Sequence, residues 1–380
     1  MIARRKKIAY VSGTRADFGL MKSVLKAIDQ HRGLKLQLYV TGMHLMRQFG
    51  QTIREVKRIF PKTKILKAMV SGDNHAAAAQ FFAKVSMVVS REFTRNRPDL
   101  VLVLGDRPEM LAVACVCLYL GIPVAQLHGG ERTGTVDELA RHAITKLGSL
   151  HLPATADAAK RIRKLGEDPR RIKIVGAPAM DTILHARLPV RRQLLKHLGI
   201  KQALKSFILV TLHPISEDPE HAGGQMRLVL DAVASFGLPV VAIYPNADVG
   251  GKKMIAVLKQ YQKQTDFYVF PSIRYENFLA LEREAAVWVG NSSGALIEGA
   301  YFGTPVVNVG PRQLNRLRGN NVIDADYDLG QIRKAITSAL QGKRVKSRSL
   351  WGDGRTGPRV AKLLSELPLS KSFQLKRITY

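Results

Sequence analysis

Titratable side chains crowd into one segment of the sequence, HGGERTGTVDELARHAITKL, which spans residues 128–147. Its acidic members are Glu131, Asp137 and Glu138, and its basic members include Arg132, Arg141, His142 and Lys146. Carboxylates and histidines held close to cations are the groups that move protons in enzymes, because neighbouring charges adjust their pKa values. The segment directly follows the strand-like run IPVAQL, so it begins where a buried strand should end.

A second segment, VWVGNSSGALIEGAYFGTPVVNVG, reads as strand, Gly-Asn-Ser-Ser-Gly turn, helix and strand. Such a turn offers an anion free backbone N–H groups, the hydroxyls of Ser292 and Ser293, and the positive end of a helix. Glu298 lies one to two turns further on, where it could reach ribose hydroxyls. The alternative is a helix whose serines cap only its own backbone. We favour phosphate binding because Gly290 and Gly294 bracket the hydroxyls.

Polar residues follow other apolar runs as well. They are Arg15 and Asp17, then His44, then Asp106 and Arg107 in LGDRPE, and His213 in VTLHPISED. Each has a structural alternative, since a lone histidine is more often a satisfied core residue and an aspartate before a helix is often only its N-cap. RQLNRLRG, residues 312–319, adds three arginines that suit either an anion site or a solvated face.

Several common chemistries lack their signatures in this sequence. There is no GxxxxGK[ST] phosphate loop, no GxGxxG after the first strand-like run and no GxSxG nucleophile turn. The ten histidines are scattered and show no metal-ligand spacing, so we expect neither a metal site nor a cofactor. These absences disfavour NAD-dependent, ATP-driven and serine-hydrolase chemistry.

The elements that position the polar residues alternate between strand-like and helix-like runs. Strands are expected at residues 7–13, 34–42, 100–105 and 122–130, with helices at 16–31 and 107–121. A second series has strands at 206–214, 238–246, 267–273, 286–293 and 304–310, with helices at 226–237, 254–264, 275–285 and 294–303. Uniformly apolar strands separated by helices indicate parallel sheets buried on both faces, and hence a doubly wound α/β fold. Because ligands bind beyond the carboxyl ends of such strands, we expect one site in a cleft between two domains.

Composition narrows the class of protein further. The 380 residues exceed one comfortable core, and the only cysteines, Cys115 and Cys117, suggest buried thiols in a reducing cytoplasm. No secretory signal or membrane span is expected, because the apolar runs are short or are interrupted by Gly121 and Pro123. The formal net charge of +29 draws anions in general, but no nucleic-acid-binding signature accompanies it, so no nucleic-acid partner is expected.

The motifs occur together in an order that resembles a known family. GTRADFGLM, VTGMHL, VLGDRPE, HGGERTGTVDELARHAITKL, GAPAMD, LHP, YPNADVGG, GNSSGALIEGAYFGTPVVNVG and RQLNRLRG are similar in content and order to the hydrolysing UDP-N-acetylglucosamine 2-epimerases of sialic-acid biosynthesis. The resemblance spans residues 7 to about 360. It implies two Rossmann-like domains facing across a cleft, as in the glycosyltransferase-B architecture. We expect the domains at residues 1–182 and 183–355, and a C-terminal helix and tail at 356–380 that pack back on the first domain.

The resemblance also implies a reaction. Members of that family convert UDP-N-acetylglucosamine and water to N-acetylmannosamine and UDP, by elimination to a 2-acetamidoglucal and hydration with inversion at C2. The weakly acidic C2 proton requires a placed base, and the departing diphosphate requires preorganised positive charge. Membership further implies a stand-alone cytoplasmic enzyme that forms a homodimer or homotetramer.

Site roles carried over from the family fall on matching positions. Asp106 and Asp137 match acidic catalytic residues, and we expect Asp137, with Glu131 as the alternative, to handle the proton. Arg107 and His213 match groups that orient or stabilise the diphosphate. The remaining substrate-binding positions are Arg15, Asp17, His44, Asn246, Ser292, Ser293, Gly294, Glu298, Arg312 and Arg318.

One position departs from the family pattern. Several members have a catalytic glutamate two residues before the second glycine of the Gly-Gly pair, where this chain has His128. A histidine can also act as acid or base near neutral pH. It could equally mark a branch that acts on UDP-N,N′-diacetylbacillosamine of the legionaminic-acid pathway. A glycosyltransferase of the same architecture and a non-catalytic anion- or nucleic-acid-binding protein are the remaining alternatives.

Overall fold

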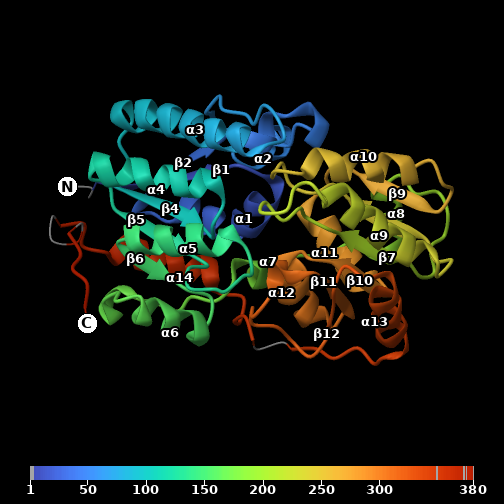
Figure 1. Ribbon diagram of the computed structural model, residues 1–380. Helices are drawn as coiled ribbons and strands as arrows, with labels where there is room; N and C mark the ends of the chain where they lie inside the picture. The colour runs from blue at the N-terminus through green and yellow to red at the C-terminus, as the bar shows by residue number, and fades with distance from the viewer. Residues whose placement is uncertain (1–3, 348–349, 371–372, 374, 380) are drawn as a thin grey trace.

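The computed structural model describes residues 4–347, 350–370, 373 and 375–379. Two α/β units lie side by side, each built on a parallel sheet with helices on both faces (Figure 1). This is the doubly wound α/β fold predicted from the alternating apolar runs, and the prediction is confirmed. Residues 1–3 lie outside the described residues. So do residues 371, 372, 374 and 380, which belong to the expected C-terminal tail.

The first sheet has the strand order β3-β2-β1-β4-β5-β6. Its strands are β1 Lys6–Ser12, β2 Leu34–Val40, β3 Lys64–Ile65, β4 Leu100–Leu104, β5 Val124–Leu127 and β6 Leu150–Leu152. Its helices are α1 Arg15–Gln30, α2 Ile53–Ile59, α3 His75–Arg95, α4 Pro108–Leu120, α5 Val136–Leu147 and α6 Ala156–Lys164. Every residue of β4 is buried, as a continuous LVLVL run between two helical layers requires.

The second sheet has the order β12-β11-β10-β7-β8-β9. Its strands are β7 Ile208–Thr211, β8 Val240–Ile243, β9 Phe267–Phe270, β10 Val287–Gly290, β11 Val306–Val309 and β12 Val322–Ala325. Its helices are α8 Arg191–His197, α9 Ala222–Ala234, α10 Gly251–Tyr261, α11 Tyr275–Glu284, α12 Ser293–Phe302 and α13 Leu329–Gln341. Gly290 ends β10 with φ of 142°, and a Cβ there would lie 2.0 Å from the Thr211 carbonyl oxygen, so only glycine fits.

Both sheets share one topology. Counting strands within each unit, the order is 3-2-1-4-5-6 in both, and the strand order reverses between β1 and β4 in one and between β7 and β10 in the other. Loops that leave neighbouring strands at such a reversal point diverge to opposite faces and open a crevice at the carboxyl ends. The two crevices face each other across the molecule.

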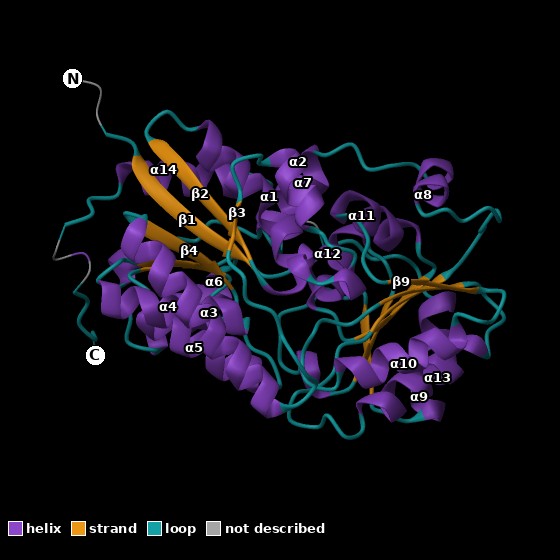
Figure 2. Ribbon diagram, turned by 90° about the horizontal axis from the view of Figure 1, so that it is seen from above, coloured by secondary structure: helices purple, strands orange, loops and turns teal. Residues whose placement is uncertain are grey.

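Two further helices follow the points where the chain passes between the units. α7 Pro178–His185 lies between α1 of the first unit and α12 of the second, and α14 Thr356–Glu366 returns to pack against α1 and α7 (Figure 2). Val360, Ala361 and Leu364 of α14 enter the hydrophobic core of the first sheet. The chain therefore crosses between the units twice. Among the described residues, no helix is long and apolar enough to cross a membrane.

Candidate active site

Two adjoining pockets open between the carboxyl ends of the sheets. We call the first the polar pocket, because ionisable residues line it, among them Asp17, Asp106, Arg107, His128, Glu131, Asp137, Arg141, Asp248, Arg312 and Arg316. The second, the apolar pocket, is lined by Met43, Ile243, Tyr244, Pro271, Ile273 and Phe278 together with His213, Ser292 and Gly294. The pockets share Thr14, Ala16, Leu20, Asn246, Ser293 and Glu298, so they form one continuous cleft.

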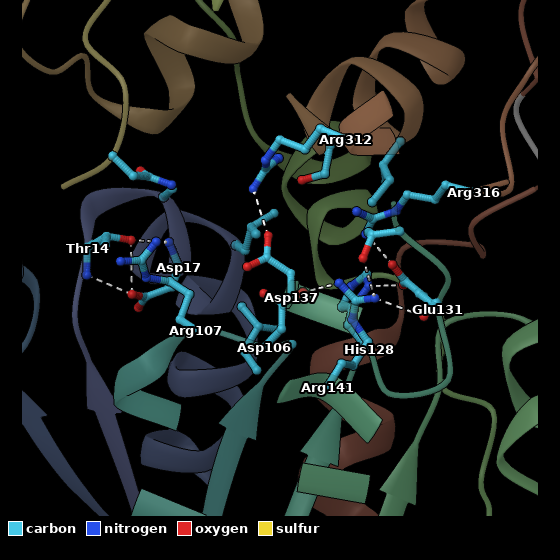
Figure 3. A pocket seen from close by; sticks show the side chains of 18 of the residues that line it. Thr14, Asp17, Asp106, Arg107, His128, Glu131, Asp137, Arg141, Arg312 and Arg316 are labelled. Atoms are coloured by element: carbon cyan, nitrogen blue, oxygen red, sulfur yellow. Dashed lines mark hydrogen bonds and ion pairs between the residues drawn. The ribbon is translucent and has the colours of Figure 1, made fainter. Parts of the chain in front are cut away.

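Asp137 lies at the centre of the polar pocket (Figure 3). It is the second residue of α5, and its Oδ2 accepts a hydrogen bond of 3.1 Å from Arg312 Nη2 on the opposite unit. Burial raises the pKa of Asp137, and the neighbouring Asp106 carboxylate raises it further, although Arg312 opposes both effects. A carboxyl group with a raised pKa holds and releases a proton nearer neutral pH than an ordinary aspartate does.

Asp106 follows β4 and pairs with Arg141, which is buried one turn beyond Asp137 on α5. Burial alone lowers the pKa of Arg141, but Asp106 and Glu131 outweigh it and raise that pKa. Asp106 is thus compensated by a fixed cation, while it stays close enough to act electrostatically on Asp137.

Glu131 has a different environment from Asp137. Its carboxylate is buried and pairs with Arg316 from the opposite unit and with His128, whose Nδ1 lies 2.5 Å from Glu131 Oε1. Burial disfavours its ionised form, but Arg316, His128 and Arg141 together outweigh burial and lower the pKa of Glu131. Glu131 is held as an anion that joins the two units.

His128 carries backbone strain. Its φ of 55° lies in the left-handed region, which a non-glycine residue enters at a cost of about 1–2 kcal/mol. The imidazole lines the polar pocket, and its Nε2 is buried without a partner in the described structure. A strained residue that leaves a ring nitrogen free inside a pocket is a candidate for binding or catalysis.

Asp17 supports the turn after β1, and Arg107 reaches across the cleft. Asp17 is buried and accepts hydrogen bonds from the N–H groups of Gly13 and Thr14, which completes a capping box at the start of α1. Arg107 lies close to Glu109 and, across the cleft, 3.6 Å from Asp248. Burial opposes the charge of Arg107, but Glu109 and Asp248 outweigh it and raise its pKa.

His213 is fixed by two hydrogen bonds from the second unit. Its backbone N–H donates to Asn291 Oδ1 at 2.7 Å, and its Nδ1 accepts the backbone N–H of Asn246 at 3.2 Å. Burial lowers the pKa of His213 well below its ordinary value, and Arg312 and Arg107 lower it further. The ring is therefore neutral and carries its proton on Nε2, which makes it a hydrogen-bond donor toward the cleft that it lines.

The Ser-Ser turn caps a helix and also lines the cleft. Ser292 is the N-cap of α12, and its Oγ accepts the N–H of Gly294 at 3.3 Å, as the capping alternative predicts. Ser293 lines both pockets at the N-terminus of α12, where an anion is favoured. Glu298 is buried beside it, and Tyr275 donates to its Oε1 at 3.1 Å. Burial raises the pKa of Glu298, whose Oε2 has no partner in the described structure.

Two expected site residues lie outside both pockets. His44 is fully buried, with Nε2 2.8 Å from Ser12 Oγ and Nδ1 2.6 Å from Thr52 Oγ1, so both ring nitrogens are occupied. Arg318 pairs with Asp324 and donates to the Gln313 carbonyl oxygen. Arg15 does line the apolar pocket, where it lies 3.1 Å from Glu55.

The structure also brings residues into the cleft that the sequence did not single out as site residues. They are Thr14, Arg141, Asp248, Tyr275 and Arg316. Arg141 stands in the charge-rich segment HGGERTGTVDELARHAITKL, and Arg316 stands in the arginine-rich RQLNRLRG, so both had a local signal. Tyr275 had none, because its place depends on how α11 packs against Gly19 of α1.

Comparisons with known proteins agree with this architecture. A profile of the UDP-N-acetylglucosamine 2-epimerase family matches residues 26–365. The chain is 37% identical to UDP-N,N′-diacetylbacillosamine 2-epimerase (hydrolyzing) of Legionella pneumophila, over 99% of this chain and all of that protein. It is 34% identical to UDP-N-acetylglucosamine 2-epimerase of Neisseria meningitidis, over 92% of both chains. The fold matches that of Methanocaldococcus jannaschii UDP-GlcNAc 2-epimerase in complex with UDP-GlcNAc and UDP, with a TM-score of 0.76 at 18% identity over 95% and 99% of the two chains.

Proposed function

The chain belongs to the UDP-N-acetylglucosamine 2-epimerase family, as its motifs predicted, and from that premise we propose that it is a hydrolysing 2-epimerase of a UDP-linked 2-acetamido sugar. The products are UDP and the free 2-epimer, N-acetylmannosamine when the substrate is UDP-N-acetylglucosamine. The observation that supports this most directly is that Asp137, a carboxyl group of raised pKa, faces a set of uncharged hydrogen-bond donors suited to an anion.

We assign proton removal to Asp137. In the first step the C2–H bond breaks and the proton passes to the Asp137 carboxylate, the C1=C2 double bond forms, and the C1–O bond breaks with its electron pair left on UDP. The raised pKa of Asp137 and the lowered pKa of Glu131 favour Asp137 over Glu131 for this role, because Glu131 is held as an anion by Arg316 and His128.

The leaving diphosphate would lie against the second unit. Neutral His213 offers its Nε2–H, Ser293 and the first N–H groups of α12 offer further donors, and Arg312 adds a cation beside Asp137. Donors already fixed before the reaction stabilise a developing charge without reorganisation. In this proposal the apolar pocket takes the nucleotide base, and Glu298 accepts from the ribose hydroxyls.

Hydration completes the reaction. Water bonds to C1 of the glucal through its oxygen as it loses one proton, and a proton adds to C2 from the face opposite to the one that was deprotonated, which inverts C2. The proton lost by water replaces the one given to C2, and Asp137 releases its own proton to solvent. A second acid must stand on that face. Asp106 and His128 both line the polar pocket, and we assign this second proton to one of the two.

The sugar has two candidates. UDP-N-acetylglucosamine is the substrate that the family motifs imply. UDP-N,N′-diacetylbacillosamine is favoured by the 37% identity to the Legionella enzyme over 99% of this chain. All the relatives compared above are named as epimerases, which disfavours the glycosyltransferase and non-catalytic alternatives.

A proton NMR time course in D₂O, with each UDP-sugar in parallel, tests the proposal. Free UDP together with a 2-epimerised sugar that carries deuterium at C2 is expected from at least one substrate. The faster substrate identifies the sugar. Absence of UDP release from both, in a preparation that still binds UDP, would overturn the assignment.

A further inference from the structure

Two helices that begin beside the cleft, α5 and α10, have no side-chain N-cap of their own. α5, which carries Asp137 and Arg141, has Thr135 at its N-cap position with no side-chain hydrogen bond, and Thr135 Oγ1 is buried without a partner in the described structure. α10 has Gly250 at its N-cap position, which has no side chain to offer. The free N–H groups at a helix start require acceptors, and both helix starts lie at the cleft.

The missing acceptors come from the opposite unit in both cases. Asp73, in the loop before α3 of the first unit, accepts the N–H of Gly250 on Oδ1 at 2.9 Å and the N–H of Lys252 on Oδ2 at 3.1 Å. Glu217, in the loop after β7 of the second unit, accepts the N–H of Val136 on its Oε1. Each unit therefore caps a helix of the other.

Residues next to both capped helix starts line the cleft. The loop before α10 carries Asn246, whose N–H fixes the tautomer of His213, and Asp248, which lies beside Arg107. The residue after Val136 on α5 is Asp137. The loop that carries Glu217 also carries His213. A cap that forms only when the units meet thus fixes groups on both sides of the cleft at once.

We propose that Asp73 and Glu217 are positioning residues that couple closure of the cleft to assembly of the active site. The proposal rests on the proposed 2-epimerase function for its kinetic readout alone. Neither carboxylate lines either pocket, so neither acts on the substrate directly. When the units separate, both carboxylates and all three N–H groups pass to water. Closure exchanges those contacts for two charge-assisted caps.

The chain supplies a matched control for each residue. Asn74, the neighbour of Asp73, caps α3 within its own unit through the N–H of Ala77 at 2.8 Å. Glu220, in the same loop as Glu217, pairs with Lys253 at 2.8 Å within the second unit. Asn74→Ala therefore removes a helix cap, and Glu220→Ala an exposed carboxylate contact in the same loop as Glu217, without breaking a contact between units.

Hydrogen exchange with and without UDP is the decisive measurement. Asp73→Ala is expected to speed exchange at residues 250–252, where its own contacts are lost, and also at residues 135–138, which Glu217 covers. Glu217→Ala is expected to speed exchange at residues 135–138, where its own contact is lost, and also at residues 250–252, which Asp73 covers. Loss of protection at the distant cap is the signature of shared closure, because a purely local cap protects only its own helix.

Steady-state kinetics give the second readout. Asp73→Ala and Glu217→Ala are each expected to lower kcat/KM about fivefold, the size of effect that one helix cap of typical strength produces. Glu217→Gln, which keeps an acceptor oxygen, should recover most of that loss. Asn74→Ala is expected to lower the melting temperature by about 2 °C with kcat/KM within twofold of the parent.

The outcomes separate this proposal from the proposed function. If exchange rises only at the cap that was removed and kcat/KM stays within twofold, the coupling is overturned while the epimerase assignment stands. If the parent protein turns over neither UDP-sugar, yet UDP protects both helix starts and each variant loses protection at the distant cap, the function is overturned and the coupling stands.

Discussion

The two sides of the cleft satisfy their polar groups in opposite ways. On the first unit, Asp106, Glu131, Asp137 and Arg141 form a network of charges, and the pKa values of Glu131, Asp137 and Arg141 depend on their neighbours. On the second unit, burial and the nearby Arg312 and Arg107 keep His213 neutral, and its hydrogen bonds are made with the Asn291 side chain and the backbone N–H of Asn246. A reaction that moves protons on one carbon and releases an anion from the next requires this division, because a proton carrier must titrate whereas an anion binder works best when fixed.

Asp137→Asn tests the titrating side most directly and has the largest expected effect. It keeps an acceptor for Arg312 but removes the group that takes the proton, so kcat is expected to fall about 10²–10⁴-fold. UDP affinity, measured by calorimetry, should stay unchanged. Asp29→Asn, an exposed acid near the end of α1, is the control. A variant that retains a tenth of parental kcat would remove Asp137 from the role of base.

His213→Ala tests the second unit, whose hydrogen-bond donors are fixed before the reaction. Removal of one preorganised donor from a developing oxyanion typically costs about 10²-fold in kcat. Because the pKa of His213 lies well below neutrality, the loss should be equal at pH 6 and pH 8. His221→Ala, an exposed histidine that follows the same strand, should be silent. A loss that varies strongly with pH in this range would mean that His213 titrates and belongs with the first group.

The adjacent serines sharpen the comparison within the second unit. Ser293→Ala is expected to weaken UDP binding about tenfold, as loss of a hydrogen bond to a charged group does, with an unchanged melting temperature. Ser292→Ala removes the cap of α12, so it should lower stability by about 1 kcal/mol and affect binding less. Equal effects of both substitutions on UDP affinity would show that Ser292 acts as more than a cap.

The pH profile of kcat/KM carries the smallest expected effect. Asp137 must be ionised to accept a proton, so activity falls as pH drops through its raised pKa. Arg312 lowers that pKa, and Arg312→Gln should therefore move the acid limb upward by about one pH unit. Asp106 raises the pKa of Asp137, so Asp106→Asn should move the acid limb of the profile to lower pH. Shifts in the same direction would contradict the assignment of the limb to Asp137.

The sequence predicted central strands better than edge strands. β1, β4, β7 and β10 lie between two neighbours and two helical layers, so their runs are mainly apolar and were recognised. Of the four edge strands, β3, β6 and β12 are two to four residues long and were not predicted, whereas β9 was predicted. Half of the hydrogen-bonding capacity of an edge strand faces away from the sheet, which relaxes its pattern.

The candidate site followed the same logic. Asp106, His213 and Ser293 were predicted from their places after strands or at a helix start, and Asp137 from the family resemblance; the structure places all four in the cleft. His44 carried the same signal but is buried beneath the cleft, since burial depth does not appear in a local pattern. The pairs Arg312–Asp137 and Arg316–Glu131 could not be predicted, because they depend on how two separately folded units meet.

The double crossing of the chain has a mechanical consequence. A single tether leaves two bodies free to turn about any axis, whereas two tethers, here near α7 and before α14, leave rotation about the line that joins them as the easiest motion. The cleft should therefore open by rotation about a hinge axis that passes through both tethers. Residues far from this axis move furthest per degree of rotation, so their contacts separate first. A small rotation should therefore admit substrate while the residues beside α7 barely move.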